Sequence, residues 1–425
     1  MGTMNVQIKQ AYLAILKEEL IPAMGCTEPI ALAYAAAKAT ELLGTIPEQI
    51  VAHCSGNMIK NVRCVQIPNS GGMQGIETAV ALGAVGGDAT RNMEVLEAVT
   101  PQTLEQAKEL LRKGICAVEY LDSEIPLHFM IEATTRKDNV TVEVMYSHLN
   151  IVKITKNGDV LHQIETSDNH KDSGDRALLT MEGIKTFADE IELHEIKNLF
   201  DKQIQYNMDI AYEGISGEYG VNIGKIIRNC YGESTVTRMK AYAAAASEAR
   251  MGGCDMPVII NSGSGNQGIA SSVPVIVYAR ENNIPKERLY RALVFSALLT
   301  IYQKEFIGKL SAFCGAVSAS CAAGAAITYL CGGTMEQIKA TVDNTLANIP
   351  GIICDGAKIS CAAKIASSVD AAMMAHFLAM NDKAYQAYTG ILKEETGETI
   401  SCVGYIGKIG MKETDKEIVK MMLDT

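Results

Sequence analysis

Three cysteines in the C-terminal half have the type and setting that metal chemistry needs. Cys314 lies in a predicted helix of small residues over 308–331, and Cys354 and Cys361 flank the polar turn Cys-Asp-Gly-Ala-Lys-Ile-Ser-Cys. Thiolates are the usual ligands of iron–sulfur clusters, but these spacings match no ferredoxin pattern. Free cysteines are also often buried for packing alone. The residues therefore leave two interpretations open, and the Pro-Gly and Asp-Gly pairs around Cys354 favour a ligand in a loop.

A fourth cysteine lies where a helix is predicted to begin. Cys26 precedes Thr27, Glu28 and Pro29, which suit the cap, the positive end and the first turn of a helix. A thiol at a helix N-terminus has a lowered pKa and favours the thiolate. Cys26 is thus either a base or nucleophile, or a helix-start cysteine without a task.

Two glycine-rich loops precede small-residue helices, at residues 69–75 and 261–268. They are either tight turns or nests of backbone N–H groups that hold a small carboxylate. Neither has the Lys-Ser/Thr of a phosphate-binding loop or the setting of a dinucleotide fingerprint. The candidate substrate-binding residues are Asn69, Ser70, Gly71 and Gln74 in the first loop, Asn261, Ser262, Gly263, Asn266 and Gln267 in the second, and Asn57 and Lys60 in a nearby polar segment.

The elements that must position these residues indicate an α+β fold. A chain of 425 residues favours two lobes. Alternating apolar residues predict strands over 49–68, broken by the polar segment 55–61, and further strands between 115 and 162, with a hairpin at Asn157-Gly158. Helical spacing dominates after 178. We expect N-terminal helices in 1–44 that join a helical lobe, an α/β lobe over 45–165, a polar linker over 165–176, and a mainly helical lobe with a buried small-residue helix over 178–425.

Composition excludes several classes of function. The net charge of -11 argues against nucleic acid or an anionic membrane as a partner. Twelve cysteines without a signal sequence indicate thiol or metal chemistry in the cytoplasm. The uncharged run 310–330 is long enough for a membrane span, but its Ala, Ser and Gly content favours a buried helix. The histidines are scattered, which argues against a zinc hydrolase.

Four motifs together resemble one known family. They are Gly-Cys-Thr-Glu-Pro-Ile-Ala at 25–31, Asn-Ser-Gly-Gly-Met-Gln-Gly at 69–75, Asn-Ser-Gly-Ser-Gly-Asn-Gln-Gly at 261–268, and Ile-Cys-Asp-Gly-Ala-Lys-x-x-Cys at 353–361. This set is similar to the L-cysteine desulfidase family, a single-chain relative of the alpha part of iron–sulfur L-serine dehydratases. The resemblance covers essentially the whole chain. It implies a 4Fe–4S cluster held by Cys314, Cys354 and Cys361, with Cys26 as the base.

The resemblance also implies an activity. A carbon–sulfur lyase of this kind would convert L-cysteine to hydrogen sulfide, ammonia and pyruvate without pyridoxal phosphate. The partner would be a small amino acid, with no nucleic acid and no membrane, and a homodimer is compatible with the sequence. Two other functions stay open: an L-serine or L-threonine dehydratase that uses the same cluster, and a non-enzymatic iron–sulfur sensor.

Overall fold

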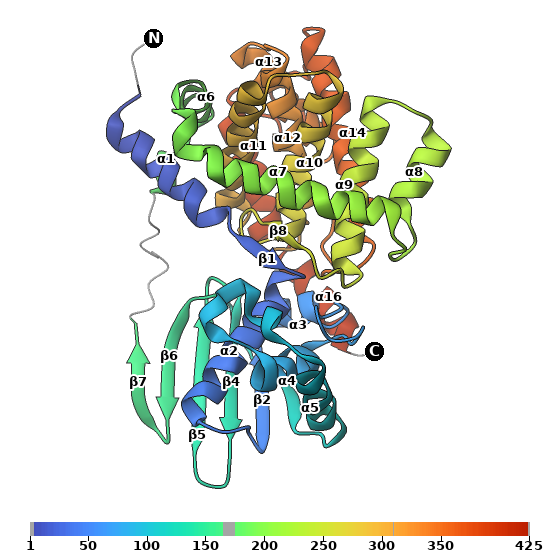
Figure 1. Cartoon of the computed structure of the whole chain (residues 1–425). Helices are drawn as coiled ribbons and strands as arrows, with labels where there is room; N and C mark the ends of the chain where they lie inside the picture. The colour runs from blue at the N-terminus through green and yellow to red at the C-terminus, as the bar shows by residue number, and fades with distance from the viewer. Residues whose placement is uncertain (1–3, 165–174, 309, 424–425) are drawn as a thin grey trace.

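The computed structural model describes residues 4–164, 175–308 and 310–423, and it has two lobes. A helical lobe lies above a smaller lobe built on a mixed sheet (Figure 1). The predicted α+β class is confirmed, with the helices and the sheet segregated as expected. Most of the predicted linker at 165–176 lies outside the described residues.

The smaller lobe is organised by one six-stranded sheet in the order β3-β2-β4-β5-β6-β7. Strands β2 and β3 are parallel, and the other neighbours are antiparallel. The alternation that predicted strands also orients them: Phe129, Ile131 and Ala133 of β4 are buried. Asn157 and Gly158 adopt positive φ at the predicted hairpin. The strands are β2 (Gln49–Cys54), β3 (Cys116–Tyr120), β4 (His128–Thr134), β5 (Asn139–Met145), β6 (Ile151–Lys156) and β7 (Asp159–Gln163).

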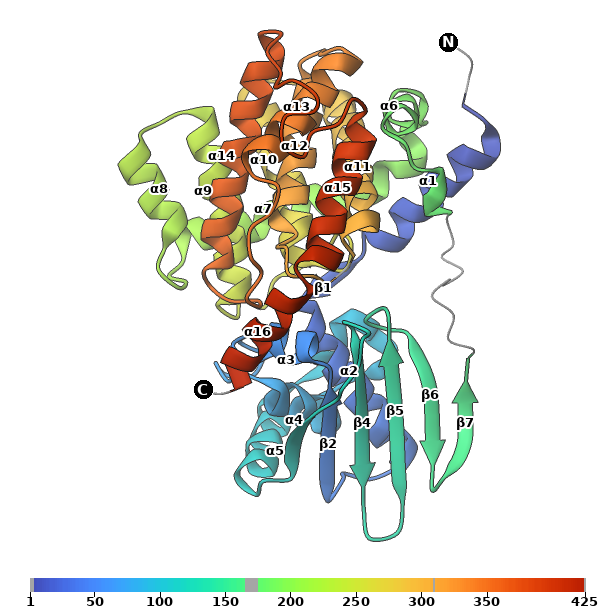
Figure 2. The same ribbon diagram turned by 180° about the vertical axis from the view of Figure 1, so that it is seen from behind.

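Helices cover this sheet and connect it to the other lobe. Helix α2 packs on β4, β5 and α4, and α5 packs on α4. Two short strands, β1 and β8, pair between the lobes. Helix α16, near the C-terminus, lies beside α3 at the junction (Figure 2). The bounds are β1 (Pro22–Met24), α2 (Thr27–Leu43), α3 (Gly56–Val62), α4 (Ile76–Gly86), the 3₁₀ segment η1 (Ala89–Ala98), α5 (Pro101–Arg112), β8 (Pro257–Ile259), the π-helical turn η3 (Ile406–Gly410) and α16 (Lys412–Leu423).

The helical lobe surrounds α12, which packs against α10, α11, α13 and α14. Its small residues let neighbouring backbones approach closely: a Cβ on Gly324 would lie 2.9 Å from the carbonyl oxygen of Ala372. The helices are α1 (Val6–Glu19), the 3₁₀ turn η2 (Arg176–Leu178), α6 (Met181–Glu190), α7 (Leu193–Ser216), α8 (Ile223–Tyr231), α9 (Thr235–Met251), α10 (Gly265–Glu281), α11 (Lys286–Ile307), α12 (Ala316–Leu330), α13 (Met335–Asn348), α14 (Cys361–Met380) and α15 (Thr396–Tyr405).

The structure differs from three sequence expectations. Of the N-terminal helices in 1–44, α1 contacts the helical lobe, whereas α2 packs on the sheet because most of its faces are apolar and need cover. The polar segment with Asn57 and Lys60 forms helix α3, not a break between strands. The small-residue helix begins at Ala316, so Cys314 lies in the loop before it. Among the described helices, none combines the length and the apolar character of a membrane span.

Candidate active site

A backbone bridge brings two of the predicted cysteine ligands together. Phe313 and Ile353 form an isolated antiparallel bridge. The Cys314 N–H donates to the Ile352 carbonyl at 2.8 Å, and the Cys354 N–H donates to the Ala312 carbonyl at 2.7 Å. This pairing brings the two thiols close enough for each to shift the pKa of the other. Two loops 40 residues apart in sequence therefore present their thiols at one place.

The third cysteine begins helix α14 next to this pair. The Cys361 thiol donates to the Gly356 carbonyl at 3.7 Å and lies within electrostatic reach of Cys314 and Cys354. Gly356 itself holds the loop against α3, because a Cβ there would lie 2.1 Å from the Lys60 carbonyl oxygen. The loop that carries Cys354 thus packs closely between α14 and the smaller lobe.

The pKa of one of the three thiols is lowered, which favours its thiolate form. The hydrogen bond from Cys314 lowers the pKa of Cys354 to about 6, and the positive charge of Lys60 acts in the same direction. The same hydrogen bond, with burial, raises the pKa of Cys314 well above its usual value. Burial also raises the pKa of Cys361. These opposite shifts favour the thiolate at Cys354 and the protonated thiol at Cys314.

Three lysines, two of them buried, lie near the three sulfurs. Lys60 is 1% exposed and Lys304 4% exposed, and Lys364 donates to the Asp355 carboxylate at 2.5 Å. Burial lowers the pKa of Lys304 to about 8, although the nearby Cys314 and Cys354 oppose the shift. Cations in these positions compensate negative charge on a thiolate-bound group.

The three cysteines suit a cluster better than a single ion. All twelve cysteines of the chain are free. Within 4–164, 175–308 and 310–423, no three His, Cys, Asp or Glu side chains converge tightly enough for one metal ion. An ion such as zinc needs sulfur at about 2.3 Å, whereas a cluster carries its thiolates on different iron atoms. Three thiols from two loops and a helix start, with lysines nearby, fit the second arrangement.

Cys26 lies beside this group but is not the thiolate that its position predicts. It precedes the first residue of α2, is 3% exposed and packs in one apolar cluster with Cys361, Val65 and Met251. Its thiol donates to Glu28 Oε2 at 3.0 Å. Burial raises the pKa of Cys26 well above its usual value, and the charge of Glu28 adds to this. The expected lowering by the helix end is wrong for this state, because burial and a carboxylate outweigh it.

The second glycine-rich loop meets the Cys26 turn. Thr27 Oγ1 donates to the Gly263 carbonyl at 2.8 Å. Asn266 Oδ1 accepts from Ser247 Oγ at 3.0 Å. Gln267 is buried beneath Gly315, where an added Cβ would lie 2.4 Å from its Cδ. The predicted residues Gly263, Asn266 and Gln267 thus lie between Cys26 and the loop of Cys314.

Two other residues of this loop have structural partners. Asn261 Nδ2 donates to the Ala297 carbonyl at 3.2 Å, and Ser262 Oγ donates to Asn261 Oδ1 at 2.8 Å. These contacts hold the loop in place and leave Asn261 and Ser262 less suited to a ligand.

The first loop reaches the site only at its start. Pro68 packs so tightly on Gly25 that a Cβ there would lie 2.3 Å away. Beyond it, Asn69 Nδ2 donates to the Leu96 carbonyl at 3.0 Å, and Ser70 Oγ donates to the Met73 carbonyl at 3.0 Å. Gly71 and Gln74 are exposed. The structure brings these four residues into no described contact with the cysteines, and their role in binding stays a prediction.

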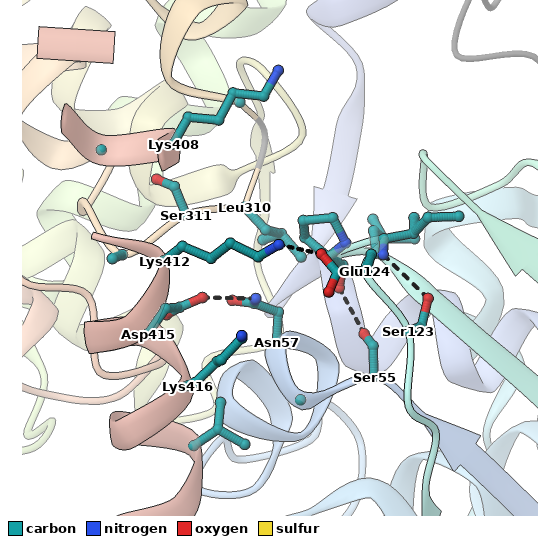
Figure 3. Close-up of a pocket in the computed structure, with 18 of the residues that line it drawn as sticks. Ser55, Asn57, Ser123, Glu124, Leu310, Ser311, Lys408, Lys412, Asp415 and Lys416 are labelled. Atoms are coloured by element: carbon teal, nitrogen blue, oxygen red, sulfur yellow. Dashed lines mark hydrogen bonds and ion pairs between the residues drawn. The ribbon is translucent and has the colours of Figure 1, made fainter. Parts of the chain in front are cut away.

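Asn57 lines a cleft between the lobes, whereas Lys60 is buried and is not part of the wall of that cleft. Both bind Asp415 of α16, Asn57 through Nδ2 at 2.8 Å and Lys60 through its ammonium group. The cleft has a volume of about 850 Å³, and Figure 3 shows Lys412 reaching across it to Glu124. Its wall includes residues 310–312, just before Cys314, but none of the four site cysteines. The cleft therefore adjoins the loop of Cys314 but does not contain the site of the four cysteines.

Sequence reasoning missed one deeply buried cation of the site. Arg250, in the last turn of α9, is 1% exposed and within electrostatic reach of Cys26. The only sequence signal was an arginine at the end of a buried alanine-rich helix. A charge in such a helix is rarely left without a partner.

Comparisons with known proteins cover nearly the whole chain. Residues 90–420 match the family model described as serine dehydratase alpha chain. A UPF0597 protein of Lachnoclostridium phytofermentans is 46% identical, over 96% of this chain and 98% of the relative. UPF0597 proteins of Desulfitobacterium hafniense and Treponema denticola are 46% and 43% identical, and each alignment covers at least 97% of both chains. A model match over most of the chain and full-length relatives lead to one conclusion: the protein belongs to the serine dehydratase alpha chain family.

Proposed function

We propose that the protein is a carbon–sulfur lyase that eliminates sulfide from L-cysteine with the help of an iron–sulfur cluster. The observation that carries the proposal is the position of Cys26: it packs against Cys361, whose sulfur lies within electrostatic reach of Cys314 and Cys354. The candidate base and the three candidate cluster ligands are therefore neighbours, which supports the proposal. Family membership supports lyase chemistry in general.

Cys314, Cys354 and Cys361 would hold a 4Fe–4S cluster. When bound, such a cluster supplies an iron without a protein ligand, which acts as a Lewis acid for the leaving sulfur. The ammonium group of Lys304 would offset part of its negative charge, and Lys60 and Lys364, which are paired with Asp415 and Asp355, would contribute less. Pyridoxal phosphate has no part in the proposal. The protein would act in the cytoplasm, where its thiols stay reduced.

The chain's own residues handle the proton. Cys26 and Glu28 share one proton and one negative charge along their 3.0 Å hydrogen bond. As Cys26 Sγ takes the substrate's Cα proton, its own proton passes to Glu28 Oε2. The Cα–H and Cβ–S bonds break, and aminoacrylate and sulfide leave. Aminoacrylate tautomerises and reacts with water to give pyruvate and ammonia. Burial of the site keeps bulk water away during proton transfer.

The experiment compares two cysteine variants of anaerobically purified protein. Cys26→Ala should retain iron and the visible spectrum but release sulfide about 10²–10⁴-fold more slowly, the usual contribution of a general base. Cys64→Ala is the control, because Cys64 is exposed and has no proposed role. Full activity in Cys26→Ala would remove it from the mechanism.

A second candidate is an L-serine or L-threonine dehydratase with the same residues. It is favoured by the description of the matching family as serine dehydratase alpha chain. Rates of pyruvate release from L-cysteine, L-serine and L-threonine decide between the two. Cluster-loaded protein that acts on none of these amino acids would instead support a sensor.

A further inference from the structure

The guanidinium of Arg250 is buried with most of its hydrogen-bonding capacity unused. Nη1 donates to Asn266 Oδ1 at 3.1 Å. Among the residues that the structure describes, Nε and Nη2 have no partner. An arginine carries five N–H donors and stays charged, and burying N–H donors without hydrogen-bond partners costs free energy. Such a group is suited to bind an anion through its unused donors.

The unused donors lie at the start of a long helix. A Cβ on Gly265, the first residue of the 17-residue helix α10, would lie 2.3 Å from Arg250 Nε and 2.8 Å from Nη2. Glycine leaves room for the guanidinium there. The first backbone N–H groups of a helix and its positive dipole end also favour an anion. Two independent sources of positive potential therefore coincide.

A free acceptor lies on the same helix. Gln267 is 5% exposed, and its Oε1 has no partner within the described chain. Its amide lies under Gly315, the residue after Cys314. On the other side, Thr27 ties the start of α2, with Cys26, to Gly263. The starts of α2, α10 and α12 are thus joined around a buried donor and a buried acceptor.

We propose that Arg250 binds the α-carboxylate of the amino-acid substrate through Nε and Nη2, and that Gln267 Oε1 accepts from its α-ammonium group. This inference rests on the proposed function for the substrate class and adds the residues that select it. Arginine suits a carboxylate because two parallel N–H groups match its two oxygens. The pair Arg250 and Gln267 then admits free α-amino acids and rejects amides and esters, which carry no carboxylate charge.

The test uses ligands that cannot react. L-Alanine has both recognised groups but no leaving group, and L-alaninamide lacks the carboxylate. Thermal unfolding of the anaerobically purified protein should shift upward with L-alanine and not with L-alaninamide. Equal shifts with both ligands would overturn the proposal, and this comparison needs no variant.

Variants then assign the effect to Arg250. Arg250→Gln should weaken L-alanine binding at least tenfold and raise KM for L-cysteine more than it lowers kcat, with an unchanged iron spectrum. Arg250→Lys keeps the charge but only one point of contact, and it should bind at an intermediate level. Arg112→Gln, a change on an exposed side chain of α5, is the control. Wild-type affinity in Arg250→Gln would contradict the assignment; if that variant does not fold, Arg250→Lys decides.

The two proposals can fail separately. L-Alanine binding that depends on Arg250, in a protein that releases no sulfide from L-cysteine, would sink the lyase and keep the carboxylate site. Sulfide release at the same rate in wild type and in Arg250→Gln would refute the carboxylate site and keep the lyase.

Discussion

Replacing Gly356 by alanine should lower the free energy of unfolding for two reasons. One is the strained backbone, and the other is an overlap with the residue that holds the loop of Cys354 in place. Gly356 has a φ of +96°, and an added Cβ would lie 2.1 Å from the Lys60 carbonyl oxygen, whereas Cβ atoms essentially never approach within 3.0 Å. The left-handed backbone costs a non-glycine residue about 1–2 kcal/mol. Overpacking adds about 1–3 kcal/mol. We expect a loss of about 2–5 kcal/mol in the free energy of unfolding, from a total near 5–15 kcal/mol.

Gly332 provides a matched control. Its φ is +82°, and an added Cβ would meet nothing within 4 Å. Gly332→Ala should therefore lose only about 1–2 kcal/mol, the backbone penalty alone. Urea unfolding of metal-free protein measures both variants, and iron analysis after anaerobic purification measures ligand placement. Gly356→Ala should hold less iron, because relief of the overlap moves the loop of Cys354 away from α3. Equal stability loss and equal iron in the two variants would refute this reasoning.

Three further predictions follow from buried groups. Cys354→Ser should lose most bound iron, whereas Cys321→Ser, a buried change in α12, should keep it; equal iron in both would remove Cys354 from the ligand set. Asp415→Asn leaves Lys60 buried without its partner and should cost about 3–5 kcal/mol in urea unfolding, against less than about 0.5 kcal/mol for the exposed Glu413→Gln. Burial lowers the pKa of His376 from 6.5 to about 4, so the unfolded chain binds the extra proton between these values, and stability falls as pH drops from about 6.5 to 4. His376→Gln should flatten that loss by about 3 kcal/mol, and an unchanged pH profile would show that His376 is not the cause.

The parts of the fold that sequence predicted are those set by local pattern. Alternation along residues 128–145 predicted β4 and β5, and Asn157-Gly158 predicted the hairpin, because both signals act within a few residues. The start of α12 was misplaced because the residues before it are uncharged and small, as they are within the helix. Phe313, in the loop before α12, forms a bridge with Ile353, and a contact between residues so far apart in the sequence cannot be predicted from a local pattern.

The candidate site was predicted in its residues but not in its electrostatics. Motif resemblance selected Cys26 and the three cluster cysteines. The pKa of Cys26 depends on complete burial and on Glu28 folding back onto it, and neither follows from a helix-start position. The sequence did not predict a binding role for Arg250, because that role depends on Gly265, which approaches Arg250 only in the folded chain. The role of a buried charged side chain depends on the groups around it, and the tertiary structure determines which groups these are.

Iron and sulfide analysis of anaerobically purified protein, with a visible spectrum and a sulfide assay on L-cysteine, tests the central claim most directly. We predict about four iron atoms per chain, lost when Cys314, Cys354 and Cys361 are all changed to serine, and sulfide release only by the iron-loaded form. Full iron content in the triple variant, or sulfide release by iron-free protein at the same rate, would contradict it.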